Sequence, residues 1–162
     1  MKSVIIYYSL DGNTRLIAET IAQETKGDLL ELKPKKELSS SSSKLNKYFW
    51  GGKSILLKEK PMLLNQDIIL DKYDTIFIGT PIWVGTYSTA FNTFIEQHSI
   101  SNKNIALFAC HGGGGVSKCF LNFKKAFPNN NFIGEVDFFD PLKNHTEENI
   151  LKLKEWISSL DI

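Results

Sequence analysis

The chain has 162 residues, of which 42% are hydrophobic and 23% charged, a composition typical of a folded globular domain and not of a disordered chain. Its formal net charge of +1 argues against nucleic acid as a partner, because phosphate binding needs a clustered basic surface, and it has no apolar run of the ~20 residues that a membrane span requires. The first residues lack the apolar core of a signal peptide and two cysteines are too few for a disulfide framework, so we expect a single cytoplasmic domain over residues 1–162 with neither a membrane nor a nucleic-acid partner.

Apolar runs that suit buried strands alternate along the chain with stretches whose apolar residues recur at helical spacing. Strands are expected at residues 4–8, 28–32, 75–80, 104–110 and within 131–139. Helices are expected at residues 13–25, around 87–95, around 116–127 and around 150–160. Five strands that alternate with helices predict an α/β fold, a doubly wound five-stranded parallel sheet with helices on both faces.

Residues 35–73 are expected to form a long connection between the second and third strands. The connection contains a serine run at 39–43 and many lysines, and its first half is expected to be solvated with one short helix. Tyr48, Phe49 and Trp50 follow one another in its middle, and three adjacent aromatic side chains are costly to leave in water. We therefore expect them to cover a ligand, to contact a second copy of the chain in a homodimer, or to pack against the sheet.

Ligands of an open parallel sheet bind beyond the carboxyl ends of the strands, near the point where the strand order reverses. The loop after the first strand runs directly into a helix, and its hydroxyl groups, its glycine and the helix N-terminus suit an anion. The sequence therefore predicts a phosphate site here, with ordinary helix capping by Asn13 or Thr14 as the alternative. The loop consists of Ser9, Leu10, Asp11, Gly12, Asn13 and Thr14.

The loop after the third strand carries a tryptophan outside the strand, where a core position is hard to arrange. Trp83 suits stacking on a planar ring, and packing on the next helix is an equal alternative. The residues expected at the site from this loop are Thr80, Pro81, Ile82, Trp83, Val84 and Gly85.

The loop after the fourth strand contains four consecutive glycines, which cost entropy and allow the backbone to approach a ligand closely. His111 is expected either to donate to a ligand or stabilise an anionic ring, or to be an exposed loop histidine. Cys110 and Cys119 are expected to be small buried hydrophobic residues without a catalytic role. The site residues expected from this loop are His111, Gly112, Gly113, Gly114 and Gly115.

Taken together, the three loops resemble the flavodoxin family, over nearly the whole chain. Ser9, Gly12 and Thr14 match that family's phosphate loop, a hydroxyl residue followed by Thr-Gly-x-Thr, and residues 79–83 resemble its first isoalloxazine loop. Residues 49–60 also resemble an insertion of clostridial-type flavodoxin-like proteins. The resemblance implies a noncovalently bound FMN cofactor that lies against Trp83.

Three departures from the family pattern affect the function. Asp11 stands where many relatives have threonine, and because a carboxylate repels a phosphate, we expect Asp11 to turn toward solvent. The glycine-rich loop after the fourth strand lacks the tyrosine that stacks on the other flavin face in many flavodoxins. The chain also lacks the negative charge that steers an electron carrier to its partners.

The resemblance implies an FMN-binding electron-transfer protein whose partners are redox proteins or a small-molecule electron acceptor. The missing tyrosine and the weak charge favour one alternative, an NAD(P)H-dependent FMN or quinone oxidoreductase. A binding module that keeps the fold without a flavin is an alternative from another class.

Overall fold

The sheet has five parallel strands. The structure, a computed structural model, describes residues 2–36, 44–65 and 68–162, and within residues 44–56 it describes only the side chains of residues 46 and 51–56. The strand order is β2-β1-β3-β4-β5, and every neighbouring pair is parallel, which confirms the predicted fold class. The strands are β1 (Ser3–Tyr7), β2 (Asp28–Glu31), β3 (Thr75–Pro81), β4 (Asn104–His111) and β5 (Asn131–Phe139).

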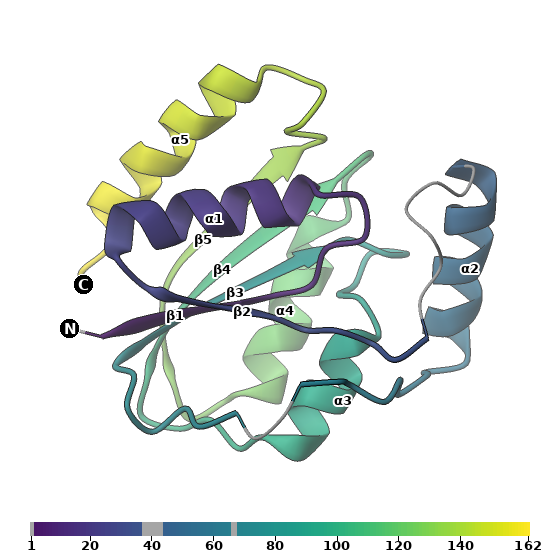
Figure 1. The fold of residues 1–162 in the computed structure, drawn as a ribbon, viewed down its shortest axis with the longest axis horizontal. Helices are drawn as coiled ribbons and strands as arrows, with labels where there is room; N and C mark the ends of the chain where they lie inside the picture. Colours follow the sequence, from purple (N-terminus) through teal and green to yellow (C-terminus); the bar gives the residue numbers. More distant parts are fainter. Residues whose placement is uncertain (1, 37–43, 66–67) are drawn as a thin grey trace.

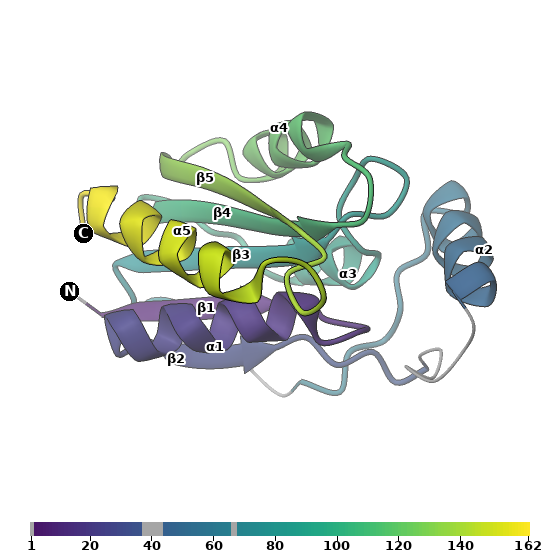
Figure 2. The same cartoon turned by 90° about the horizontal axis from the view of Figure 1, so that it is seen from above.

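Helices cover both faces of the sheet. In Figures 1 and 2, α1 and α5 lie on one face, α3 and α4 lie on the other, and α2 stands beyond the carboxyl ends of the strands. The helix predicted at residues 87–95 begins later than expected, because Tyr87 still belongs to the loop that precedes it. The helices are α1 (Asn13–Thr25), α2 (Lys44–Leu56), α3 (Ala90–Gln97), α4 (Val116–Ala126) and α5 (Thr146–Ser159).

Alternate residues of each central strand supply two apolar cores. Ile5 and Tyr7 of β1 pack under α1 and α5, whereas Val4 and Ile6 face α3 and α4. This alternation follows from the pleat of a strand, which sends successive side chains to opposite faces. Burial of each Ile, Leu or Phe side chain stabilises the folded state by roughly 1.5–3 kcal/mol. The two cores therefore fix the sheet, and with it the positions of the carboxyl ends of its strands.

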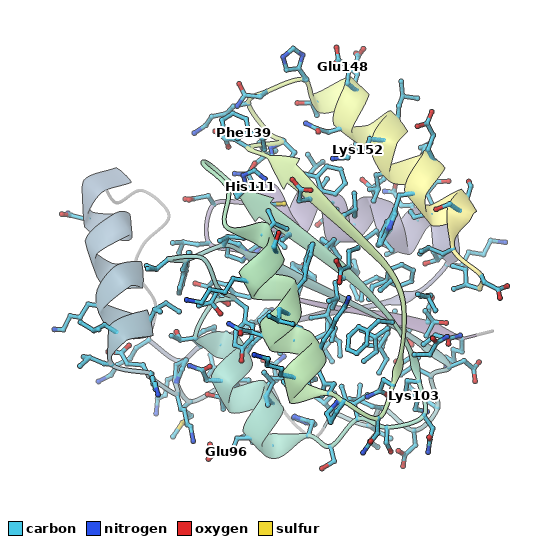
Figure 3. The ribbon with its side chains drawn as sticks, turned by 180° about the vertical axis from the view of Figure 1, so that it is seen from behind. Glu96, Lys103, His111, Phe139, Glu148 and Lys152 are labelled. Carbon is cyan, nitrogen blue, oxygen red and sulfur yellow. The ribbon has the colours of Figure 1, made fainter. Side chains whose placement is uncertain are left out.

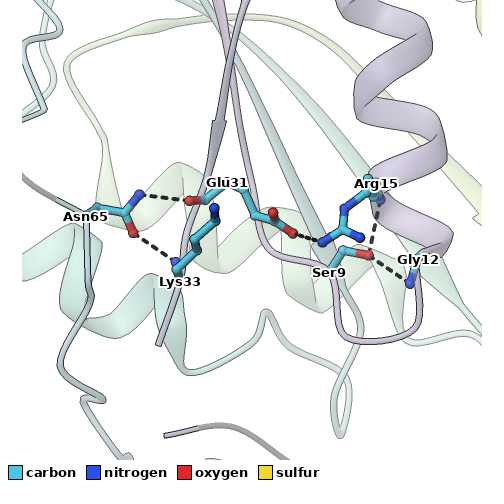
Figure 4. A network of polar contacts seen from close by, with 6 residues as sticks. All are labelled: Ser9, Gly12, Arg15, Glu31, Lys33 and Asn65. Atoms are coloured by element: carbon cyan, nitrogen blue, oxygen red, sulfur yellow. Dashed lines mark hydrogen bonds and ion pairs between the residues drawn. The ribbon is translucent and has the colours of Figure 1, made fainter. Parts of the chain in front are cut away.

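The connection between β2 and β3 contains a helix, α2, as predicted, and it returns beside the chain that leaves β2. The Lys35 N–H donates to the Met62 carbonyl at 2.8 Å, and the Leu64 N–H donates to the Lys33 carbonyl at 2.7 Å. The Asn65 side chain adds hydrogen bonds to the Glu31 carbonyl and the Lys33 N–H, both at 2.8 Å (Figure 4). The sequence did not predict this antiparallel pairing.

The backbone of residues 48–50 lies within α2. The side chains of Tyr48, Phe49 and Trp50 lie outside the described part of the chain. Their assignment to a ligand cover, a dimer contact or the core therefore stays a prediction. None of the helices in the described ranges is both long enough and apolar enough to cross a membrane.

Candidate functional site

A cavity of about 550 Å³ lies where the loops after β1, β3, β4 and β5 meet. Its position at the carboxyl edge of the sheet is the one predicted for a ligand, and its size falls within the range of about 300–1,000 Å³ typical of small-molecule sites. The cavity is lined by Ser9, Leu10, Asp11, Asn13, Thr14, Pro81, Ile82, Trp83, Cys110, His111, Gly112, Asp140, Leu142 and Lys143.

The loop after β1 presents hydrogen-bond donors at the start of α1. The Ser9 Oγ accepts the N–H groups of Gly12 and Arg15, each at 3.2 Å, which leaves its own hydroxyl hydrogen available to donate (Figure 4). Among the described residues, the backbone N–H groups of Asn13 and Thr14 have no hydrogen-bond partner. These N–H groups and the helix dipole favour an anion at this position.

The N-cap of α1 is Gly12, with a φ of 91°, and the Ser9 side chain bonds to the first turn of the helix through the Arg15 N–H. The left-handed conformation is readily adopted by glycine, which has no Cβ. Neither Asn13 nor Thr14 is therefore the N-cap of α1, and the capping alternative is wrong. Asp11 is exposed and also belongs to the cavity lining, so its expected turn toward solvent stays a prediction.

The Asn13 side chain instead joins the loop after β1 to the loop after β5. Its Nδ2 donates to Asp140 Oδ1 at 2.9 Å, and its Oδ1 accepts the Leu142 N–H at 2.9 Å. Lys143 of the same loop lines the cavity, together with the carboxylates of Asp11 and Asp140. The sequence analysis missed this loop, although the end of a fifth parallel strand lies at the same edge as the others.

Trp83 begins a tight turn in the loop after β3. The N–H and C=O groups of Trp83 and Thr86 bond to each other at 2.9 and 3.0 Å, while Val84 and Gly85 between them have φ values of 50° and 74°. A valine in the left-handed region costs roughly 1–3 kcal/mol, and such strain is concentrated at functional sites. The turn fixes the backbone from which the indole projects.

The Trp83 ring contacts two other elements. It meets the Tyr8 ring edge to face, with centroids 5.5 Å apart and an interplanar angle of 83°. A Cβ placed on Gly51 of α2 would lie 3.4 Å from the indole, so this helix passes close to the ring. Trp83 therefore lines the cavity while it packs on Tyr8, directly after β1, and on α2, and its stacking on a ligand ring stays a prediction.

Thr80 lies beneath the same loop. Its buried hydroxyl accepts the Ser88 N–H at 3.0 Å and donates to the Pro81 carbonyl at 2.9 Å. Thr80 therefore supports the loop from below and does not line the cavity. Val84 and Gly85 also lie outside the lining.

His111 holds the loop after β4 in place. Its Nδ1 accepts the Gly114 N–H at 3.0 Å, and its Nε2 lies 2.9 Å from Asp137 Oδ2. Because Nδ1 accepts, the proton lies on Nε2 and is donated to the carboxylate. The side chain is only 12% exposed, so His111 is not an exposed loop histidine. Figure 3 shows His111 beside Phe139, at the ends of β4 and β5.

The four glycines of this loop fall into two pairs. Gly114 and Gly115 have φ values of 101° and 88°, and a Cβ on Gly115 would lie 2.9 Å from the Gly85 Cα. Gly112 and Gly113 have no left-handed φ, and a Cβ on either would meet no atom within 4 Å. The fold therefore requires glycine at the second pair and not at the first. Gly112 lines the cavity, and Gly113, Gly114 and Gly115 lie outside its lining.

Both cysteines are buried thiols. Cys110 lines the cavity, and its burial raises its pKa to about 12, although a hydrogen bond with Thr14 acts in the opposite direction. Burial also raises the pKa of Cys119 to about 12. A thiol is nucleophilic only as the thiolate, so neither cysteine is a nucleophile near neutral pH.

These features define a doubly wound α/β protein with a ligand cavity at the switch in strand order, with anion donors on one side and an aromatic ring on another. The family model described as Flavodoxin matches residues 2–160, and the chain belongs to the flavodoxin family, as the sequence resemblance predicted. No curated protein matches the chain by sequence.

Solved structures share the fold. A candidate flavoprotein from Bacteroides eggerthii is 25% identical with a TM-score of 0.79, covering 99% of this chain and 98% of its own. A candidate flavoprotein from Bacteroides uniformis is 25% identical with a TM-score of 0.80, covering 97% of each chain. A Lactobacillus acidophilus flavoprotein in complex with FMN is 23% identical with a TM-score of 0.71, covering 96% of this chain and 98% of its own.

Proposed function

We propose that the protein binds FMN noncovalently in this cavity and acts in electron transfer. The observation that carries the proposal is the pair of N–H groups of Asn13 and Thr14, which have no partner among the described residues and begin α1 at the same cavity that Trp83 lines. FMN has a phosphate at one end and a planar ring at the other, and the cavity offers a matching group for each. Family membership and the FMN complex of the Lactobacillus acidophilus relative support the same cofactor.

The residues around the cavity suit distinct parts of FMN. The Ser9 hydroxyl and the first N–H groups of α1 would donate to the phosphate, and Lys143 would add a positive charge. Trp83 would face the ring system, and the open backbone at Gly112 would approach it from the loop after β4. When bound, FMN supplies the redox chemistry, and the protein controls its position and access.

An FMN-dependent oxidoreductase is the second candidate function. Residues 111–117 contain no tyrosine, tryptophan or phenylalanine, so this loop lacks the large stacking ring that many flavodoxins place there. A flavin face left open on this side suits a small-molecule reductant or acceptor. Steady-state oxidation of NADH and NADPH with a quinone distinguishes the two roles, because a carrier shows no turnover without a separate reductase.

FMN and riboflavin, which differ by the phosphate, test the cofactor assignment. Hydrogen bonds to a charged group contribute roughly 1.5–3 kcal/mol each, so the wild-type protein is expected to bind FMN at least about tenfold more tightly than riboflavin. In Gly12→Val, a side chain replaces a glycine at φ 91° whose Cβ would lie 3.2 Å from Leu142 Cδ1. This variant is expected to lose FMN affinity and to keep most of its riboflavin affinity.

Trp83→Ala serves as the matched comparison, since it removes a ring contact and no phosphate contact. Aromatic stacking contributes ~1–3 kcal/mol per ring in nucleic-acid sites, so both flavins are expected to weaken alike. Equal wild-type affinities for FMN and riboflavin would contradict the phosphate assignment. Binding of neither flavin would favour the flavin-free module.

A further inference from the structure

A second cavity, of about 580 Å³, lies beside the candidate FMN site. Tyr8 and Trp83 form the side of this cavity nearest the first, and Trp83 lines both cavities. The remaining walls come from the chain that leaves β2, from the return segment at residues 59–62 and from the start of α3. Nothing in the proposed FMN contacts uses these walls.

Hydrogen bonds hold the walls of the second cavity in position. The Asn92 side chain of α3 donates to the Glu59 carbonyl at 2.8 Å, and the Thr93 hydroxyl donates to the Pro61 carbonyl at 2.7 Å. The Lys35 N–H donates to the Met62 carbonyl at 2.8 Å, which joins the chain that leaves β2 to the return segment at residues 59–62. The cavity is therefore preformed, which lowers the entropic cost of binding a ligand.

The inner surface of the second cavity suits a flat aromatic ligand. Its apolar lining includes two aromatic rings at an interplanar angle of 83° and a methionine, the side chain that adapts best to ligand shape. The apolar lining residues are Tyr8, Pro34, Pro61, Met62, Trp83 and Ala90.

The charged residues of the lining favour a negative ligand. The lining contains three lysines, Lys35, Lys36 and Lys60, and one carboxylate, that of Glu59. Lys60 pairs with Glu96 at 2.6 Å. Lys35 and Lys36 are exposed and, within the described part of the chain, have no ion-pair partner. Two exposed cations in the lining of a largely apolar cavity attract an anion.

We propose that the second cavity binds a planar aromatic anion, an aromatic carboxylate or sulfonate of about two fused rings. The aromatic part lies against Tyr8 and Trp83, and the acidic group lies toward Lys35 and Lys36. Because Trp83 separates the two cavities, the aromatic anion and FMN bind at the same time. The inference concerns a separate site and does not depend on FMN binding in the first cavity.

Naphthalene-2-sulfonate is the probe, and the methyl resonance of Met62 is the readout. The chain has two methionines, so ¹³C-methyl labelling gives one signal from the cavity lining, at Met62, and one from Met1. The probe is expected to shift the Met62 signal and to show a nuclear Overhauser effect to that methyl. Titration of the intact protein without an effect at Met62 would overturn the proposal.

Charge reversal tests the role of the two lysines. The double variant Lys35→Glu/Lys36→Glu is expected to bind the probe about tenfold or more weakly, because reversing two charges beside an anion replaces attraction by repulsion. Lys125→Glu reverses an exposed charge in the last turn of α4, at the opposite edge of the sheet, and is expected to leave the affinity unchanged. Equal affinities of the double variant and the wild type would contradict the proposal.

Two further titrations separate this inference from the proposed function. Neutral naphthalene-2-methanol is expected to bind about tenfold more weakly than the sulfonate, and equal binding would refute the anion preference. With FMN at saturation, the shift of Met62 by the probe is expected to persist, and displacement by FMN would show a single shared site. If FMN fails to bind, the proposed function fails, while the Met62 titration still decides this inference.

Discussion

Alanine substitutions at three neighbouring glycines test how the loop after β4 is built. Gly113, Gly114 and Gly115 follow one another in sequence, yet their surroundings differ. Gly113 has neither a left-handed φ nor an atom within 4 Å of an added Cβ. Gly114 has a φ of 101° in open space, and Gly115 combines a φ of 88° with a Cβ position 2.9 Å from the Gly85 Cα.

These differences predict a graded loss of stability. Gly113→Ala is expected to be neutral or to stabilise by up to about 1 kcal/mol, since alanine reduces the entropy of the unfolded chain. Gly114→Ala is expected to cost roughly 1–2 kcal/mol for the left-handed conformation. Gly115→Ala is expected to cost roughly 2–5 kcal/mol, because a contact with a backbone atom adds an overpacking penalty of roughly 1–3 kcal/mol.

Urea unfolding of the three variants without added flavin measures the free energy of unfolding. A cost that rises from Gly113 to Gly115 supports the division into glycines that the fold requires and glycines that it does not. Equal costs at Gly113 and Gly115, or a large cost at Gly113, would refute it. Titration with FMN then tests the predicted flavin contact of Gly113, which neighbours the cavity-lining Gly112, and Gly113→Ala is expected to weaken FMN binding in a protein of unchanged stability.

Three other outcomes follow from the structure. Asn13→Ala removes both hydrogen bonds to the loop after β5 and is expected to lower the free energy of unfolding by about 1–2 kcal/mol in urea titrations. The raised pKa values of Cys110 and Cys119, about 12 against an ordinary value of 9.0, mean that the folded state holds neutral thiols more tightly than the unfolded chain. The stability that these neutral thiols contribute is fully present below pH 9 and is lost as the pH rises from about 9 to about 12. Cys119→Ala is therefore expected to lose less of its free energy of unfolding than the wild type across that range. Gly79→Ala places a Cβ 1.9 Å from the Phe108 ring and is expected to destabilise the sheet, with partial recovery in Gly79→Ala/Phe108→Leu measured by thermal unfolding.

The regular elements were predictable because their signals are local. The apolar stripe of α1 repeats at helical spacing and ends at a lysine in the left-handed region, and the predicted bounds of residues 13–25 match the helix. The β-branched and aromatic residues of β1, β3 and β4 likewise identify strands buried on both faces. The cavity position then followed from the topology of parallel sheets.

Side-chain contacts over long sequence distances could not be predicted in the same way. The role of His111 depends on Asp137, which lies 26 residues further along the chain. The loop after β5 joins the site through Asn13 and Asp140, which are 127 residues apart. Residues 62–65 return beside the chain that leaves β2, where the Asn65 side chain bonds to the Lys33 N–H and the Glu31 carbonyl. Such contacts become visible only once the fold brings the segments together.

Thr80 illustrates the opposite case, a residue whose type matches the family pattern while its side chain points away from the cavity. A hydroxyl at the end of β3 is compatible with either a ligand contact or a loop support. The structure shows the support, through the hydrogen bond from the Ser88 N–H. A motif match therefore identifies the loop, and the hydrogen bonds determine what each residue of the loop does.

The central claim is that FMN binds at the carboxyl edge of the sheet with its phosphate at the start of α1. Its most direct test is a titration of ¹⁵N-labelled protein with FMN, followed through the backbone amide resonances. The account predicts the largest shifts at residues 9–14 and 112–113, with smaller ones at residues 34–36 and 59–62. Amide shifts centred on residues 34–36 and 59–62 would place the flavin in the second cavity and contradict the account, as would unchanged amides at Asn13 and Thr14.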